Sequence, residues 1–202
     1  MEPSSDQPAT QSPRRASTPL VLQRLQMWVA SGLVRLHVSA GFMTVLGLLA
    51  GVGAGVAAGF EAWWLALVLV LASGLADALD GSVARATRSE STRGAFLDSV
   101  FDRVVDASWC AGLFVASTSS EARLAWFVAA TAAGVTSYVA ARAASLSLGQ
   151  PHGKLWGRPL RTVMVMGVTA FVALGGSLLV AGVICAVVWG LVAVYRASVA
   201  LR

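Results

Sequence analysis

Six long apolar stretches follow one another along most of the chain. They cover residues 41–59, 62–84, 95–117, 123–147, 162–175 and 177–195, and short polar connections separate them. About 20 apolar residues in a helix are enough to cross the hydrocarbon core of a bilayer, so this pattern predicts six transmembrane helices. We therefore expect an all-α integral membrane protein in which residues 39–202 form one six-helix domain.

The N-terminal segment has a different pattern. Residues 1–20 are rich in Ser, Pro, Thr and Gln and have almost no apolar content, which predicts a disordered cytoplasmic tail. In residues 21–38 the apolar side chains recur near helical spacing, and Gln and Arg supply a thinner polar side. This pattern favours an amphipathic helix that lies on the membrane surface. An ordinary helix packed against the rest of the protein is the alternative.

Composition supports the membrane class. Of the 202 residues, 56% are hydrophobic and only 12% are charged, and the mean hydropathy is +0.72. Such values lie well above the apolar share of a soluble domain, and the spans leave no room for a sizeable soluble domain. Cys110 and Cys185 lie inside predicted spans without the spacing of metal ligands, so we expect them to be small apolar fillers.

The basic residues predict an orientation in the membrane. If the N-terminus is cytoplasmic, Arg123 is the only one of the fifteen Lys and Arg residues that falls on the outer side. The positive-inside rule then places both termini in the cytoplasm and requires an even number of spans, as expected for a multi-pass protein of the plasma membrane. Anionic lipid headgroups account for the net charge of +5, so we predict no nucleic-acid partner.

Four acids lie in two neighbouring predicted spans, which is the feature that says most about function. They are Asp77, Asp80, Asp98 and Asp102. Spacings of three and four residues place the acids of each helix on one face. At a rise of about 1.5 Å per residue, Asp77 and Asp102 lie roughly 12 Å from the cytoplasmic turn and the other two lie nearer to it. Because acids within a membrane are costly, these four predict a functional site that faces the cytoplasm.

The chemistry of this site follows from its ligands. Four carboxylates held together repel one another, and a divalent cation removes that difficulty. Oxygen ligands suit Mg²⁺ or Mn²⁺, and four acids would satisfy two ions, which is an arrangement suited to in-line displacement at phosphorus. Gly81 and Ala84 would form a smooth wall for a nucleotide, with Arg85 near its phosphate. We therefore expect a lipid substrate with an activated phosphate.

The run from Asp77 to Asp102 reads Asp-x2-Asp-Gly-x2-Ala-Arg-x8-Gly-x3-Asp-x3-Asp. It resembles the signature of the CDP-alcohol phosphatidyltransferases at every fixed position, and the resemblance extends over residues 21–200. It implies a homodimeric enzyme that moves a phosphatidyl group from CDP-diacylglycerol to an alcohol and releases CMP. It also implies that the four acids hold two metal ions and that Asp102 is the catalytic base. The contacts that it implies with CDP-diacylglycerol are Thr44, Gly81, Ala84 and Arg85.

Two later segments, residues 137–143 and 157–161, resemble the acceptor side of bacterial phosphatidylinositol phosphate synthases. The resemblance implies an acceptor phosphate bound by Arg142, Arg158 and Arg161. Guanidinium groups suit a phosphate monoester, so a phosphorylated polyol is the expected acceptor. Inositol phosphate is favoured, although the chain departs from those synthases at Ala40, Ala140 and Gly157.

Other interpretations remain open at this point. Glycerol 3-phosphate is the main alternative acceptor, which would make the protein a phosphatidylglycerophosphate synthase. A cation or proton transporter could also use acids within the membrane, but transporters often spread such features over internal repeats, whereas here the acids lie in two adjacent spans. A family member that has lost its activity is disfavoured because all four acids are present.

Overall fold

The computed structural model describes residues 20–148 and 158–201, and within these residues it contains only helices. In chain order the helices are α1 (Leu20–Arg35), α2 (Ala40–Gly59), α3 (Trp63–Ala86), α4 (Thr92–Ala116), α5 (Ser120–Ser145), α6 (Arg158–Ala173) and α7 (Leu178–Ala200). The all-α prediction is confirmed, and the six helices after α1 begin and end within a few residues of the six predicted spans. The predicted disordered tail lies outside the described residues, except that Leu20 begins α1.

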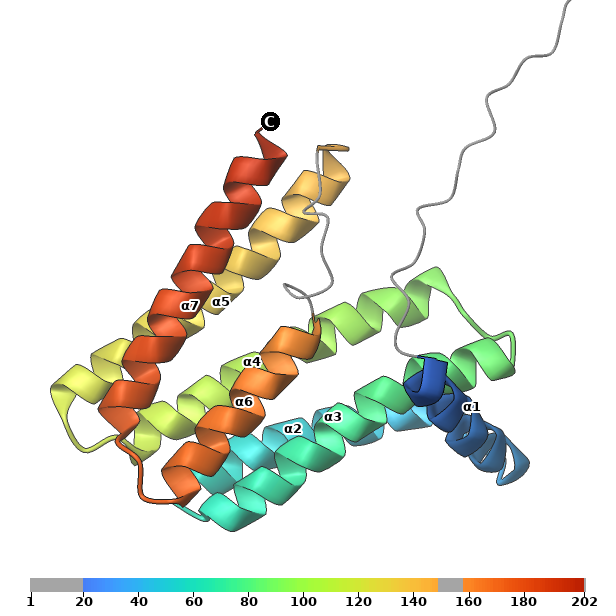
Figure 1. The fold of residues 1–202 in the computed structure, drawn as a ribbon, viewed down its shortest axis with the longest axis horizontal. Helices are drawn as coiled ribbons and strands as arrows, with labels where there is room; N and C mark the ends of the chain where they lie inside the picture. Colours follow the sequence, from blue (N-terminus) through green and yellow to red (C-terminus); the bar gives the residue numbers. More distant parts are fainter. Residues whose placement is uncertain (1–19, 149–157, 202) are drawn as a thin grey trace, which may run out of the picture.

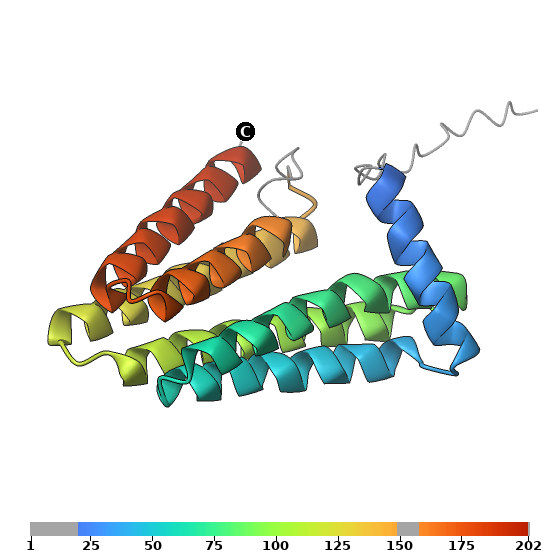
Figure 2. The ribbon, with the colours of Figure 1, turned by 60° about the horizontal axis from the view of Figure 1, so that its bottom comes forward.

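The helices form two groups that meet at one end of the molecule. Helix α2 packs along α3 and α4, α5 pairs with α7, and α6 contacts α3 and α7. Figures 1 and 2 show that the α5–α7 pair approaches the α2–α4 group near the α4–α5 connection and diverges from it toward the other end. Side chains of α4, α5, α6 and α7 line a cavity in this part of the molecule.

Small residues allow α2 to approach its neighbours closely. Helix α2 carries six glycines and buries several alanines. A Cβ atom built at Gly112 of α4 would overlap the backbone of Gly55 of α2, so the two main chains are in direct contact there. Without a hydrophobic driving force between helices in lipid, such close packing is a main source of their association.

Within the described residues, four helices are long and apolar enough to cross a membrane, namely α2, α3, α5 and α7. The other two predicted spans differ from them in identifiable ways. Helix α4 has 25 residues but carries Arg93, Asp98, Asp102, Arg103 and Asp106. Helix α6 has only 16 residues, which at about 1.5 Å each is somewhat short of a bilayer core. The structure therefore establishes a helical protein with four candidate spans, and a count of six stays a prediction.

Helix α1 has one packed side and one exposed side. It lies against α3, where Val29 and Leu33 pack on a buried cluster of Met43, Ala76 and Leu79. On its other side Trp28 is 75% exposed. A helix is thus present over most of the predicted segment, and its location at a membrane surface remains a prediction.

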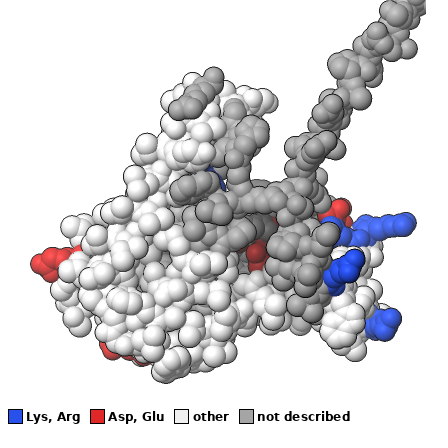
Figure 3. All heavy atoms as spheres, viewed as in Figure 1, with Lys and Arg blue, Asp and Glu red and all other residues white. Residues whose placement is uncertain are grey.

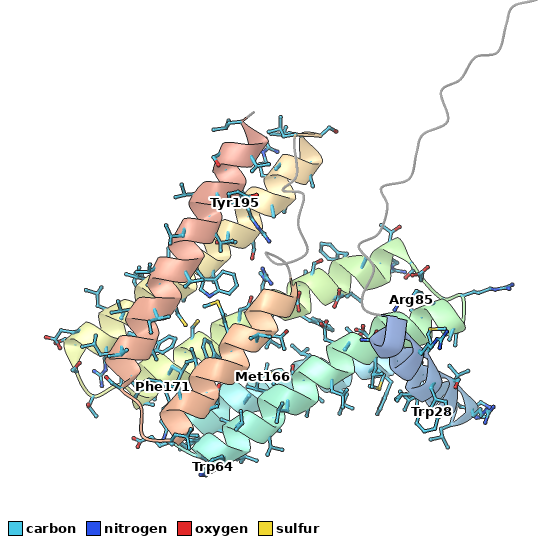
Figure 4. The ribbon with its side chains drawn as sticks, viewed as in Figure 1. Trp28, Trp64, Arg85, Met166, Phe171 and Tyr195 are labelled. Carbon is cyan, nitrogen blue, oxygen red and sulfur yellow. The ribbon has the colours of Figure 1, made fainter. Side chains whose placement is uncertain are left out.

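The two ends of the helical bundle differ in charge. Figure 3 shows Lys and Arg gathered at the end where α1 and the α3–α4 connection lie, while most of the remaining visible face is uncharged. The exposed Trp28 and Trp64 lie near opposite ends of α3 (Figure 4). Tryptophan is enriched at both membrane interfaces and basic residues at the cytoplasmic one, so this distribution fits a bundle that crosses a bilayer.

The contact between Gly55 and Gly112 predicts a sharp difference between two glycine substitutions. Gly112→Ala should lower the stability of the protein by about 1–3 kcal/mol, because the added methyl group meets backbone that cannot rotate away. Gly190→Ala on α7 is the matched control, since its Cβ atom would meet nothing within 4 Å. Thermal unfolding in detergent would compare the two variants. Equal midpoints would show that the close α2–α4 contact does not form.

Candidate active site

Three of the four predicted acids come together between α3 and α4. Asp77 on α3 and Asp98 and Asp102 on α4 each place a carboxylate oxygen within 4.8 Å of the others. All three side chains are half-buried and line a cavity of about 70 Å³ between α2, α3, α4 and α6. A divalent cation with oxygen ligands at about 2.1 Å needs those oxygens within about 4.2 Å, so small side-chain adjustments suffice to bind one. The residues present therefore fit a divalent metal ion.

Asp80 lines the same cavity but is not part of this group of three. It is buried, and its Oδ2 accepts a hydrogen bond of 2.9 Å from Oγ1 of Thr44. Thr44 lies on α2, so this bond links the carboxylate of α3 to a neighbouring helix. Donors to a carboxylate fix its orientation, and Thr44 therefore holds Asp80 toward the cavity. The resemblance implied that Thr44 contacts CDP-diacylglycerol, and its place in the cavity wall is compatible with that role.

Two arginines from different helices pair with the acids of α4. Arg161 of α6 donates to Asp102 at 2.6 Å and to Asp106 at 3.3 Å. Arg103 lies 3.1 Å from Asp106 and 3.7 Å from Asp102, and it also donates a hydrogen bond to Ser137 of α5. The side chains of the two arginines and the two acids form one ion-pair network. In it, Asp106 joins the two guanidinium groups, and Arg161 contacts the acid cluster through Asp102.

A second and larger cavity lies on the other side of this network. It measures about 780 Å³ and lies between α4, α5, α6 and α7. Its charged wall consists of Asp102, Arg103, Asp106, Arg161 and Arg196, and the remaining lining is largely small or apolar. Asp102, Asp106 and Arg161 line both cavities. One shared charged wall thus separates the two spaces.

The residues predicted to contact the nucleotide lie near the end of α3. Gly81 and Ala84 are partly buried, whereas Arg85 is exposed and donates a hydrogen bond of 3.0 Å to Ser82. Figure 4 shows Arg85 where α3 passes α1. None of the three is among the described residues that line the two cavities. Their predicted role therefore stays a prediction.

The structure describes the side chains of two of the three arginines predicted to bind the acceptor, Arg142 and Arg161. Arg161 lies in the shared wall. Arg142 is exposed in the last turn of α5, beyond the residues that line the larger cavity, because α5 has diverged from α4 by that point. Arg158 begins α6, and its side chain lies outside the described residues, as does Gly157. Only one of the three is thus seen at the cavity.

Two cavity arginines, Arg103 and Arg196, were not among the predicted acceptor residues. Arg196 donates a hydrogen bond of 3.4 Å to the carbonyl oxygen of Thr136, which fixes it between α5 and α7. The sequence carried a signal for this residue, since Arg196 is the only charged residue within the otherwise apolar α7. A charge within such a helix is by default a functional candidate.

Comparison with known proteins agrees with this arrangement. The sequence profile of the family described as CDP-alcohol phosphatidyltransferase matches residues 37–194, which is most of the chain. The chain belongs to the CDP-alcohol phosphatidyltransferase family. This membership removes the support for a transporter. A comparison with curated proteins gives no match.

Solved structures of one bacterial enzyme share the fold. The phosphatidylinositol phosphate synthase of Mycobacterium tuberculosis with CDP-diacylglycerol bound has a TM-score of 0.77 and 25% identity, with 89% of this chain and 94% of that chain covered. The same enzyme in complex with manganese and citrate has a TM-score of 0.77 and 24% identity, with coverage of 88% and 89%. Its apo form has a TM-score of 0.75 and 26% identity, with coverage of 86% and 95%.

The bond between Thr44 and Asp80 predicts an effect on metal binding. Thr44→Val keeps the shape of the side chain but removes the donor, so Mn²⁺ affinity should fall by about 10-fold to 100-fold, as for other groups that orient metal ligands. Thr44→Ser keeps the hydroxyl and should bind nearly as tightly as the wild type. Electron paramagnetic resonance of free Mn²⁺ would measure both affinities. Equal affinities for the valine and serine variants would remove this role for Thr44.

Proposed function

We propose that this phosphatidyltransferase moves the phosphatidyl group of CDP-diacylglycerol to a phosphorylated polyol and releases CMP. One observation carries the proposal. An acid cluster that fits a divalent cation shares a wall with a larger cavity lined by three arginines, and Asp102 belongs to both spaces. Family membership supplies the reaction class, and a synthase of the same fold is known with CDP-diacylglycerol bound.

The residues of the shared wall suit the steps of this reaction. An acceptor hydroxyl in the larger cavity would attack the β-phosphorus of CDP-diacylglycerol, so that a new O–P bond forms and the bond to CMP breaks. Asp102 is the proposed base, because its carboxylate lines both cavities and can take the hydroxyl proton. When bound, divalent cations neutralise the charge that develops on the phosphates. We propose two ions of Mg²⁺ or Mn²⁺, held by Asp77, Asp80, Asp98 and Asp102.

On the donor side, the proposed contacts with CDP-diacylglycerol are Thr44, Gly81, Ala84 and Arg85. Gly81 has no side chain, and a Cβ atom built there would lie only 3.3 Å from the guanidinium of Arg85. The glycine therefore leaves space beside that arginine. Arg85 lies in the last turn of α3, at the basic end of the molecule (Figure 3). A guanidinium at this position suits a diphosphate.

The larger cavity favours an acceptor that carries a phosphate. Arg103, Arg161 and Arg196 meet there against two carboxylates, and a phosphate monoester would satisfy guanidinium groups in pairs of charge-assisted hydrogen bonds. Arg142 and Arg158 stay proposed contacts of the acceptor phosphate. Inositol phosphate is our favoured acceptor, because the similar structures are of a phosphatidylinositol phosphate synthase. Glycerol 3-phosphate carries the same recognition group and is the alternative.

We further propose the setting in which the enzyme works. On the face drawn in Figure 3, Lys and Arg gather at the end of the bundle that carries α1, which supports a cytoplasmic active site with both termini on that side of the plasma membrane. On this view, α1 lies at the membrane surface and α2 to α7 all cross the bilayer. A homodimer is proposed on the family resemblance alone.

Purified enzyme should release CMP from CDP-diacylglycerol only when a suitable acceptor and a divalent cation are present. Inositol phosphate and glycerol 3-phosphate are tested beside free inositol, glycerol and serine, with CMP measured by chromatography. EDTA should abolish release, and Mg²⁺ or Mn²⁺ should restore it, because carboxylates alone cannot neutralise the reacting phosphates. Turnover in metal-free buffer, or a clear preference for an unphosphorylated alcohol, would contradict the proposal.

Arg196 and Arg142 make a matched pair of substitutions for the acceptor cavity. Arg196→Gln should raise the acceptor KM by about tenfold or more, since a charge-assisted contact with phosphate is worth about 1.5–3 kcal/mol. The KM for CDP-diacylglycerol should change little. Arg142→Gln should have the smaller effect, because its side chain is exposed beyond the cavity lining. Steady-state kinetics with each substrate varied in turn would compare the rise in acceptor KM of the two variants. A larger rise for Arg142→Gln would show that Arg142, rather than Arg196, is the main contact of the acceptor.

A further inference from the structure

Arg161 occupies a singular position between the two cavities. It lies near the N-terminal end of α6, its side chain is 14% exposed, and it lines both the small and the large cavity. One nitrogen lies 2.6 Å from Oδ1 of Asp102, and the other lies 3.3 Å from Oδ2 of Asp106. The guanidinium thus bonds directly to a member of the acid cluster while it faces the cavity assigned to the acceptor.

The bond to Asp102 makes Arg161 a competitor for that carboxylate. A cation in the acid cluster and the guanidinium of Arg161 both draw on the negative charge of Asp102, so each weakens the attraction of the other. On the opposite side, an anion in the larger cavity competes with Asp102 for the guanidinium. When a cation binds at the acid cluster and an anion binds in the larger cavity, the ion pair between Arg161 and Asp102 is replaced by two new ones. Asp102 then pairs with the cation, and Arg161 pairs with the anion.

We propose that Arg161 couples the two sites, so that a cation at the acid cluster and a phosphate-type anion in the larger cavity each raise the affinity for the other. The inference rests on the proposed function and adds to it a rule of binding order. Arg161 passes from Asp102 to the anion when both ligands are present. Arg161 is then available to the acceptor chiefly when the metal site is filled, and Asp102 loses its bond to Arg161 at the same moment.

The rest of the network makes such an exchange feasible. Asp106 also bonds Arg103, at 3.1 Å, so it keeps a cationic partner when Arg161 turns toward an anion. Arg103 in turn is anchored by its hydrogen bond to Ser137. The exchange thus needs only a small movement of one side chain and leaves no buried carboxylate without a positive neighbour.

The coupling is measured by the binding of Mn²⁺ to the purified full-length protein, without any turnover. Sulfate is the anion probe, and sodium chloride at equal ionic strength is the reference. Saturating sulfate should raise Mn²⁺ affinity by about 5-fold to 150-fold, the usual range for coupled sites, and saturating Mn²⁺ should raise sulfate affinity by the same factor. This measurement needs no variant. A Mn²⁺ affinity that is independent of sulfate overturns the proposal.

Two substitutions separate the exchange from simple attraction between a bound cation and a nearby anion. Arg161→Gln removes the shared guanidinium, so Mn²⁺ should bind in chloride at least as tightly as to the wild type, and sulfate should no longer change that affinity. Arg196→Gln removes a different guanidinium of the same cavity. It should need more sulfate but reach the wild-type factor at saturation. If Arg161→Gln retains the full sulfate effect, simple attraction explains the coupling and Arg161 has no part in it.

Failure of this inference is distinguishable from failure of the proposed function. An enzyme that releases CMP with phosphorylated acceptors but binds Mn²⁺ equally in sulfate and chloride is a phosphatidyltransferase without the coupling. A protein that shows the coupling but releases no CMP with any acceptor has the linked sites and lacks the proposed reaction.

Discussion

The placement of carboxylates inside a helical bundle is the constraint on which the rest of this structure depends. Helix α4 carries Asp98, Asp102 and Asp106 along one face, in a setting where an uncompensated charge is costly. Arg161 compensates two of them from α6, and Arg103 contributes from α4 itself. The position of α6 over the acids is therefore favoured by charge as well as by apolar contacts. The same acids that demand compensation are those able to bind a divalent cation.

Below the charged layer, close packing makes the bundle a firm support. Ser73 of α3 donates to the carbonyl oxygen of Gly47 at 2.8 Å, and Trp109 of α4 donates to Thr169 of α6 at 3.1 Å. Trp109 also meets Trp126 of α5 edge to face, with ring centroids 5.4 Å apart. These links join α3 to α2 and α4 to both α5 and α6. The acids and arginines thus project from helices whose mutual positions are set by polar and aromatic contacts.

In the proposed reaction, each of the two cavities would hold a different substrate. One is small, is walled by acids and suits cations beside the phosphates of a nucleotide-linked lipid. The other is larger, is walled by arginines and suits an acceptor that carries its own phosphate. Because Asp102 and Arg161 belong to both walls, the reacting groups would meet at a single charged boundary. Such a boundary brings together two substrates that differ greatly in polarity.

The sequence alone was enough to predict the helices and the acid cluster. Most of the apolar stretches have the length that a membrane requires. Helical spacing places Asp77 and Asp80 on one face of their helix, and Asp98 and Asp102 on one face of the next. Both features depend only on local geometry. Partners from distant helices could not be predicted in this way. Thr44 bonding Asp80, Arg161 bonding Asp102, and Arg196 rather than Arg142 facing the larger cavity all depend on how α5, α6 and α7 lie against α4. That arrangement results from close packing between helices far apart in the chain, which no local spacing encodes.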